Sequence, residues 1–377
     1  AQRWQIDATL KLAAVGITRQ DIERDLTNLE QAHALTEAMN DETRLSRVLY
    51  WLGRIHYVLL NSQIALKYAK QSLEIADRLG DDVLAAPPVN LMGRLYWAQS
   101  EFVKAAQMME RSVEQMQQVG NKTEESTAAA FAGYVLAQLG EFDRALHYAD
   151  HSIQLGREIQ NPFAESAAYH FRGIDRDQRG EWAQAIKDYE EGRRIADRAG
   201  DLFRVYLIKF WEGRAHTLNG DPSRGRVLLE ESLTLAENIG TKFGLSMLKI
   251  FFADCLLKLG KLDAALSSCQ EALHLAEETG DRFMNGLAHR TLCEIISYTE
   301  PTDAHKAERA ILEAIRIQQE ISAKPELARS YMSYANWLER KGDKEKARDY
   351  LTKAIGMFQQ MGMAWDLVKS EEILRKL

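Results

Sequence analysis

The sequence is poor in the residues that interrupt helices or build disulfide frameworks. Its 377 residues include only 6 prolines and 3 cysteines, and aromatic residues make up 8% of the chain. So few prolines, together with abundant Ala, Leu, Glu, Gln and Arg, favour helix throughout. Three cysteines (Cys255, Cys269 and Cys293) cannot form a framework of bridges, and their apolar surroundings indicate reduced thiols in a cytoplasmic protein.

The sequence also lacks an excess of positive charge and any long apolar run. The formal net charge is −7, from 48 basic and 55 acidic residues, whereas proteins that coat nucleic acid are usually basic. No run approaches the ~18 apolar residues of a membrane-spanning helix. We therefore expect neither nucleic acid nor a membrane as a partner. The chain begins with Ala1, not with Met, and without the apolar block of a signal peptide, which suggests a fragment of a longer protein.

Signatures of metal, phosphate and catalytic sites are weak. His147 and His151 have the spacing of a helical metal pair, but no Glu follows His147 and no third ligand is evident. The segment 120–123 (Gly-Asn-Lys-Thr) departs from the phosphate-loop pattern, which needs Gly-Lys-Ser/Thr after a strand. We therefore expect no cofactor, no metal and no catalytic residues.

What the sequence does have is a set of small residues at fixed spacing. One series recurs every 40 residues, a second follows it by twelve, a third marks the ends of units, and a fourth marks their middles. The series are Ala13, Gly53, Gly93, Gly133, Gly173, Gly213 and Ala253; Ala65, Ala105, Ala145, Ala185, Gly225 and Ala265; Gly80, Gly120, Gly200, Gly240 and Gly280; and Gly140, Gly180, Gly220 and Gly260. Four series in phase predict a tandem repeat with a period of 40 residues.

The spacing within each unit predicts a helical hairpin. Glycine just past a helix end takes the left-handed conformation that closes a helix, and the Asp, Asn or Thr after it caps the next helix. Small residues on two facing helices let the helix axes approach to roughly 8–10 Å. Asn161-Pro162 and Asp221-Pro222 fit the starts of helices, and Pro325 fits the start of another.

These patterns predict an all-α solenoid of nine hairpins over residues 1–362, with units that start near residues 1, 41, 81, 121, 161, 201, 241, 281 and 323. The unit at 281 is two residues longer, and we place the extra residues in its mid-unit turn at 298–302. Residues 363–377 are expected to form a C-terminal capping helix, because a repeat array must cover the apolar face of its last unit. The first unit has no such cap, which leaves self-association open.

Pro87 and Pro88 are irregular in this register, because they fall several residues after Asp81, the expected start of a helix. A proline inside a helix costs roughly 3 kcal/mol. We expect the helix to start late, at Pro87, or else to kink there, with the late start favoured. Either outcome would widen a groove beside Arg94 and Trp97.

The motifs inside the units resemble the tetratricopeptide repeat. Residues 52–56 (Leu-Gly-Arg-Ile-His) match its Leu-Gly-x-x-Tyr pattern, and residues 140–145 (Gly-Glu-Phe-Asp-Arg-Ala) and 180–185 (Gly-Glu-Trp-Ala-Gln-Ala) match its second helix. The units are longer than the common repeat of about 34 residues and lack its terminal proline. Residues 74–81 and 361–365 look most similar to the C-terminal tetratricopeptide arms of bacterial signal-transduction ATPases and regulators of the STAND/AAA type.

The resemblance implies a concave groove lined by the first helix of each unit. Carried over by register, the groove positions are Arg47, Tyr50, Arg54, Tyr57, Asn90, Arg94, Trp97, Tyr134, Phe210 and Arg214, with Gln138, His170, Asp177, Asp254, Lys258, Arg290, Glu294, Asn336, Glu339 and Arg340 as further positions, all expected to be exposed. Guanidinium groups pair with carboxylates, and aromatic faces supply contact area, so an acidic peptide is the guest expected in the N-terminal half. The alternative is that the arginines only pair with acidic neighbours.

We therefore predict a non-catalytic protein-protein interaction module of a larger signalling protein, which binds a protein or peptide in its groove. The alternative is an effector-sensing regulatory arm of a bacterial signalling ATPase, cyclase or transcription regulator. Both functions use the same fold, and the fold alone does not decide between them.

Overall fold

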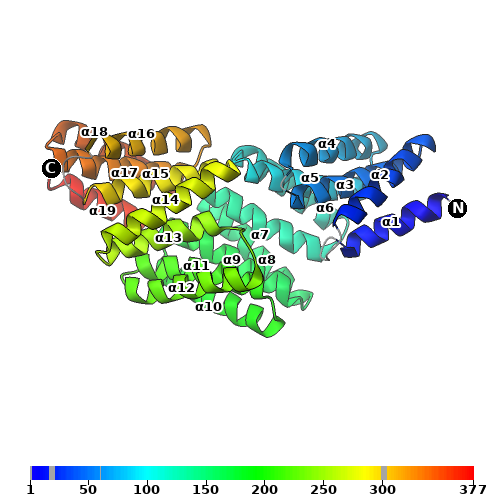
Figure 1. Cartoon of the computed structure of the whole chain (residues 1–377), viewed down its shortest axis with the longest axis horizontal. Coiled ribbons are helices and arrows are strands. Elements are labelled where there is room, and N and C mark those ends of the chain that lie inside the picture. The colour runs from blue at the N-terminus through cyan, green and yellow to red at the C-terminus, as the bar shows by residue number, and fades with distance from the viewer. Residues whose placement is uncertain (1, 17–21, 60, 299–303) are drawn as a thin grey trace. The chain divides into compact units, whose positions relative to one another are not determined.

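A computed structural model describes residues 2–16, 22–59, 61–298 and 304–377 of the chain. These residues form 19 helices and contain no strand (Figure 1), as the sequence predicts, and 87% of the chain is helical. Within the same ranges, no helix combines the length and apolar character needed to cross a membrane. Contacts divide the chain into two compact units, residues 1–128 and 129–377.

The first unit contains six complete helices and the start of a seventh. They are α1 (Gln2–Gly16), α2 (Ile22–Ala38), α3 (Glu42–Val58), α4 (Ser62–Leu79), α5 (Asp82–Ala98), α6 (Phe102–Gln118) and α7 (Lys122–Gln138). Consecutive helices from α1 to α6 pack against each other. In addition, α3 contacts α5.

The second unit holds the rest of α7 and twelve further helices. They are α8 (Phe142–Glu158), α9 (Pro162–Arg179), α10 (Trp182–Ala199), α11 (Leu202–Leu218), α12 (Pro222–Ile239), α13 (Leu245–Lys258), α14 (Leu262–Thr279), α15 (Arg282–Ile296), α16 (Ala304–Glu320), α17 (Lys324–Lys341), α18 (Lys344–Met361) and α19 (Ala364–Leu374). Consecutive helices from α8 to α19 pack together, as Figure 1 lets the reader follow by colour.

Helix ends follow the capping chemistry of the sequence. The Asp281 side chain accepts a hydrogen bond from the backbone of Met284, and Asn161 caps α9 directly before Pro162. Gly280 closes α14 at a φ of 67°, a left-handed conformation that glycine adopts without steric cost. Side-chain caps of this kind begin α3, α5, α9, α11, α12, α15 and α18. The helices α4, α6, α8, α10, α13, α14, α17 and α19 begin without one.

The two helices of a hairpin approach closely where both carry small residues. A Cβ added to Gly213 would lie 3.0 Å from the backbone oxygen of Gly225, and one added to Gly225 would lie 2.6 Å from the backbone oxygen of Gly213. Buried serines join the same pairs of helices, as where Ser232 donates a 3.0 Å hydrogen bond to the backbone oxygen of Tyr206. Small residues and these hydroxyl bridges hold the hairpins together.

The prediction of a late start at Pro87 is wrong, and so is the alternative of a helix broken there. The helix α5 runs without interruption from Asp82 and contains both Pro87 and Pro88. Asp81 caps it through a 3.0 Å bond from the Leu84 backbone nitrogen. Most side chains of this helix are buried, so tertiary packing outweighs the hydrogen bonds that the two prolines remove. No widening of a groove follows from them.

The late helix start occurs in α13 instead. Thr241, the expected cap, accepts a bond from the backbone of Phe243, but the helix begins only after Gly244, whose φ is 73°. Of the turn at 298–302, where we place the two extra residues, only Tyr298 belongs to the described residues.

Within the second unit, helices far apart in the sequence contact each other. Nη2 of Arg329 in α17 donates a 2.5 Å hydrogen bond to the backbone oxygen of Gln178 in α9, 151 residues earlier. The rings of Trp182 and Trp365 meet edge to face at 4.6 Å between centroids. Within this unit, then, the succession of hairpins turns back on itself, and α17 and α19 meet the α9–α10 corner. We call these contacts the clasp.

The three cysteines, which the sequence predicts to be reduced, are free and buried. Cys269 and Cys293 belong to the apolar core around α13 to α18. Burial raises the pKa of the Cys293 thiol to about 12, and a nearby carboxylate, Glu294, adds to this. The thiols are therefore part of the core packing.

Candidate functional site

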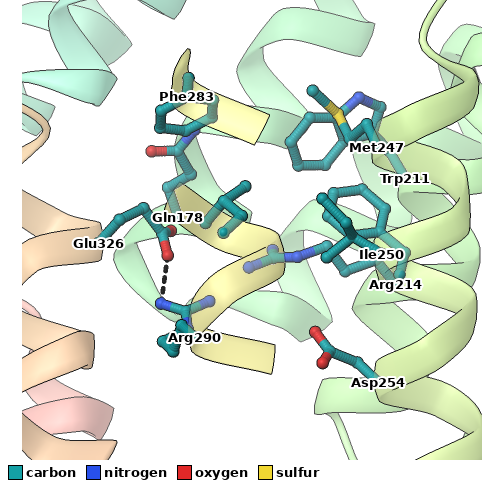
Figure 2. Close-up of a pocket in the computed structure, with 11 residues that line it drawn as sticks. Gln178, Trp211, Arg214, Met247, Ile250, Asp254, Phe283, Arg290 and Glu326 are labelled. Carbon is teal, nitrogen blue, oxygen red and sulfur yellow. Dashed lines mark hydrogen bonds and ion pairs between the residues drawn. The ribbon is translucent and has the colours of Figure 1, made fainter. Parts of the chain in front are cut away.

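One pocket of the second unit is lined by five alternate helices, α9, α11, α13, α15 and α17, which we call the pocket helices. Each contacts the next in this order. The lining residues (Figure 2) are Gln178, Trp211, Arg214, Met247, Ile250, Phe251, Asp254, Phe283, Leu287, Arg290 and Glu326. Because alternate helices face the same side of a hairpin array, this pocket lies where the sequence predicts the groove.

Charges alternate in sign along the pocket helices, at the rate of one per helix. They are Asp177, Arg214, Asp254, Arg290 and Glu326. Arg214 forms an ion pair with Asp177, and Arg290 donates a hydrogen bond from Nη1 to Glu326. Figure 2 shows Arg214 extending into the pocket between Asp254 and the pair of Arg290 and Glu326. The result is a buried ladder of charges, which we call the charge ladder.

The charge ladder shifts the pKa of its members. Burial lowers the pKa of Arg214 to about 10, and repulsion from Arg329 contributes. Burial opposes ionisation of Glu326, yet the charges of Arg290 and Arg329 hold its pKa at about 2. Burial and then Glu294 raise the pKa of Asp254 to about 6. Of Arg214, Asp254 and Glu326, Asp254 has the pKa nearest to neutral pH.

Above the charge ladder, the pocket has an aromatic and aliphatic wall. The guanidinium of Arg214 lies 5.7 Å from the ring centroid of Trp211 and 5.0 Å from that of Phe251. Gln178 is 2% exposed, and its Oε1 has no hydrogen-bond partner among the described residues. Its side chain points toward Phe283 in Figure 2. The free space that these side chains leave is only about 10 Å³, about the room of one water molecule.

A second cleft, of about 550 Å³, lies further along α13, α15 and α17. Its lining includes Lys258, Glu294, Asn336 and Arg340, four of the further groove positions. Arg340 donates a 2.9 Å bond to the backbone oxygen of Ser297. Of the predicted positions in the C-terminal half, Arg214, Asp254 and Arg290 line the first pocket, and Lys258, Glu294, Asn336 and Arg340 line the second. Phe210 and Glu339 line neither.

The first unit gathers the predicted residues of α3 and α5 into a smaller group. Nε of Arg94 donates a 2.9 Å bond to Asn90, whose amide in turn donates to Ser112 at 3.2 Å. Burial lowers the pKa of Arg94, and the positive charge of Arg54 lowers it further. Nε of Arg54 is buried with no hydrogen-bond partner among the described residues. Two guanidinium groups close enough to repel each other favour an anion between them.

Tyr50 and Tyr57 lie beside these arginines. Burial raises the pKa of Tyr50, and Tyr57 and Glu124 favour the charged form of Arg94. Arg47, one turn before Tyr50, is exposed, and Trp97 is half-buried. The aromatic and arginine residues predicted for this half therefore do lie on neighbouring helices.

The expectation that all groove positions are exposed is wrong. Among the ten main positions, Asn90 is 8% exposed, Tyr134 5%, Phe210 2% and Arg214 9%. Gln138, His170, Asp177 and Arg290 are also buried. The physical reason is that alternate helices pack side by side on this face, so side chains that point inward cover one another.

Six residues that shape this region were not predicted from the sequence: Gln178, Trp211, Phe251, Glu326, Arg329 and Asp366. Charge alternation at nearly constant spacing was the available signal, since Glu326 follows Arg290 by 36 residues and Asp366 follows Arg329 by 37. Trp211 and Phe251 carried no such signal, because aromatic residues at helical spacing usually belong to a core. In the described ranges, no group of three His, Cys, Asp or Glu side chains could hold a metal ion.

Comparisons with known proteins agree with this architecture. Residues 328–360 match the family model of the tetratricopeptide repeat. No curated protein matches the chain. A Rap protein complexed with competence and sporulation factor is similar at a TM-score of 0.69 and 12% identity, over 96% of this chain and 98% of that one. The Rap conjugation gene regulator of plasmid pLS20, in complex with the Phr* peptide, gives 0.65 and 12%, over 95% and 96%.

A third solved structure bears on the resemblance seen in the sequence. It is a signal transduction ATPase with numerous domains (STAND) that has a tetratricopeptide repeat sensor, from Pyrococcus horikoshii, with a TM-score of 0.50 and 14% identity. The likeness covers 95% of this chain and 56% of that one. The chain therefore has the fold of tetratricopeptide-type helical solenoids, and the predicted likeness to the repeat arms of such ATPases is confirmed at the level of fold.

Proposed function

We propose that the chain is a non-catalytic interaction module that binds a protein or peptide along the pocket helices. The observation that carries this proposal is the cleft of about 550 Å³ that three of the pocket helices, α13, α15 and α17, help to line. An extended peptide offers the matching groups, since its backbone supplies N–H donors and its side chains supply apolar contact area.

Two of the similar solved structures support a peptide as the guest. One is a Rap protein complexed with competence and sporulation factor, and another is in complex with the Phr* peptide. Each covers nearly the whole chain. The shared fold makes a peptide the first ligand class to test.

We further propose that the group around Arg54 and Arg94 in the first unit takes an acidic part of the guest. The partnerless Nε of Arg54 and the repulsion between the two guanidinium groups support this. A carboxylate would accept a hydrogen bond from Arg54. Tyr50 and Tyr57 would add contact area with little loss of side-chain entropy.

Selection of peptides from a displayed random library on the intact chain tests this function. Affinities of the selected peptides are then measured by calorimetry for the wild type, for Asp254→Asn in the pocket, and for the double variant R54E/R94E. A matched control is the double variant K67E/K70E, because Lys67 and Lys70 are exposed on α4.

We expect the Asp254→Asn variant or the double arginine variant to weaken binding about tenfold or more, while the lysine control binds as the wild type does. Helical content by circular dichroism shows that each variant is folded. No selected peptide, or equal affinity for all folded variants, would overturn the proposal.

A second candidate function is an effector-sensing regulatory arm of a signalling ATPase, cyclase or transcription regulator. It is favoured by the solved ATPase whose repeats are named a sensor, of which this chain covers 56%. The coding sequence upstream of Ala1 is the test. An ATPase or other output domain there supports the sensor, and a promoter and start codon directly before Ala1 contradict it.

A further inference from the structure

The helix α1 exposes apolar side chains at positions that the later repeats bury. Trp4, Ala8 and Leu12 follow one another at intervals of one turn, and we call them the α1 face. Trp4 is 81% exposed and Leu12 61%, and Ala8 between them is exposed as well. In later repeats, the residues at the register position of Ala8 are 0% exposed, as at Val48, Ala168, Ile208, Leu248 and Ala288. A surface that those repeats cover is therefore open in the first one.

In the later repeats, the second helix of the preceding hairpin covers this position. Ala168 of α9 belongs to one apolar cluster with Ile153 of α8. In the first unit, Val48 and Leu52 of α3 share a cluster with Leu29 of α2. The α1 face therefore has the register of a surface onto which a second helix packs.

The covering helix comes directly before the helix that it covers. Two to five residues separate each of the second helices α2, α4, α8, α10, α12, α14 and α16 from the first helix that follows it. The same arrangement places a covering helix for α1 within about 20 residues before Ala1.

Charge beside the α1 face indicates the polar character of that helix. Lys11 lies one turn from Ala8, is exposed and forms no ion pair among the described residues. In the second unit, Arg172 of α9 forms an ion pair with Asp150 of the covering helix α8, at 2.7 Å. A covering helix that carries a carboxylate beside its apolar stripe would give Lys11 the same kind of partner.

The last second helix of the chain does not match this description of the occupant. The helix α19 packs against α18, and Met363, at the junction of the two, is 0% exposed. Stacking of one copy onto the next through α18 and the α1 face would first have to displace α19. A second copy is therefore a poorer occupant than a helix that precedes α1 in the same polypeptide.

We propose that the α1 face is the docking surface for a further second helix of the same repeat type, supplied by residues that precede Ala1 in the full-length protein and carrying a carboxylate beside its apolar stripe. Docking continues the array by one more hairpin toward the N-terminus. This surface belongs to the first unit and shares no residue with the cleft of the second, so it is tested without a peptide ligand.

Hydrogen exchange of α1 provides the test, measured in the full-length protein and in the present chain. Each is prepared as the wild type and as Leu12→Glu. The matched control is Leu312→Glu, since Leu312 is 42% exposed on α16. Where Leu12→Glu prevents folding of the full-length protein, Ala8→Gln replaces it.

We expect α1 to exchange about tenfold more slowly, or slower still, in the full-length protein, because burial of one leucine side chain shifts an equilibrium by about that factor. Leu12→Glu should abolish this protection, whereas Leu312→Glu should leave it intact. In the present chain, Leu12→Glu should change the exchange of α1 less than about twofold, as is usual for an exposed position.

Four results would overturn the proposal. One is a gene in which the 20 codons before Ala1 contain the start or encode no helix with an apolar stripe. Another is equal exchange of α1 in both proteins. The third is unfolding of the present chain by Leu12→Glu, which would mean that Leu12 supports its own hairpin. The fourth is a dimer of the present chain in sedimentation that Leu12→Glu dissociates, since a second copy would then cover the α1 face.

Discussion

Asp366 accepts two hydrogen bonds of 3.2 Å from the guanidinium of Arg329, and both side chains are more than nine-tenths buried. A buried ion pair adds little over an apolar pair of the same volume, but the loss of one partner leaves an uncompensated charge. The pair therefore makes the attachment of α19 to α17 sensitive to a single carboxylate.

Asp366→Ala is expected to lower the free energy of unfolding by about 3–5 kcal/mol, because Arg329 then stays buried without its main partner. The matched control is Asp143→Ala, since Asp143 also pairs with an arginine, Arg179, but its side chain is 92% exposed. Exposed pairs contribute little, so the control should unfold as the wild type does. Urea unfolding followed by circular dichroism makes the comparison, and equal effects of the two substitutions would show that the clasp carries no stability.

The carboxyl group of Asp254 predicts a pH dependence. Its pKa is raised from 3.8 to about 6 by burial and by Glu294, against the opposing effects of Arg290, of Lys258 and of the bond from Thr291. The folded chain therefore binds this proton more tightly than the unfolded chain. Its contribution to stability is greatest below the unfolded pKa and is lost as the pH rises to about 6, with no further change above.

Asp254→Asn removes the loss of stability that comes from ionisation of the carboxyl group. The amide oxygen of the new side chain can still accept the hydrogen bond that Thr291 donates. The variant should gain stability relative to the wild type as the pH rises from about 4 to about 6, and the gain should then stay constant. The midpoints of urea unfolding, measured for both proteins across this pH range, test the expected gain in stability. Parallel profiles would mean that Asp254 titrates normally in the folded chain.

Gly225 and Gly356 predict opposite effects of the same substitution. Gly225→Ala places a Cβ 2.6 Å from the backbone oxygen of Gly213, where two helix backbones must separate. Such overpacking costs about 1–3 kcal/mol. Gly356, inside α18, has no atom within 4 Å of an added Cβ, so Gly356→Ala should stabilise the chain by about 0.5–1 kcal/mol through helix propensity. Thermal unfolding of both variants checks the signs.

That contrast also shows why the fold was largely predictable from the sequence. Gly213 and Gly225 belong to the two small-residue series, and close packing of two backbones leaves few other residue types at such positions. Capping residues such as Asp281 are also predictable, because they bond to backbone groups only a few residues away in the sequence. Pro87 and Pro88 were misjudged because a local penalty was weighed without the burial that offsets it, which only the neighbouring helices provide.

The site was less predictable, for a geometric reason. Register placed Arg214, Asp254 and Arg290 on one face, but the contact of Arg329 with Gln178 depends on how far each hairpin rotates relative to the last. Small rotations add up over the 151 residues between them. No pattern of neighbouring residues in the sequence reports the summed rotation of the hairpins. The contacts of the clasp could therefore not be predicted from residue spacing.

Arg54 offers a test that separates a binding residue from a structural one. Its Nε is buried with no partner among the described residues, and its charge lowers the pKa of Arg94. A group with an unmet hydrogen bond and a like charge beside it destabilises the fold, so Arg54→Met should raise the free energy of unfolding by about 1 kcal/mol. The same change should weaken the binding of an acidic peptide, since a residue kept at a cost in stability is a mark of function.

Arg47→Met is the control, because Arg47 is exposed on the same helix and its loss should leave stability within about 0.5 kcal/mol of the wild type. Urea unfolding and calorimetry on both variants decide the matter: if Arg54→Met lowers stability and leaves affinity unchanged, Arg54 serves the fold and the anion subsite of the first unit is not there.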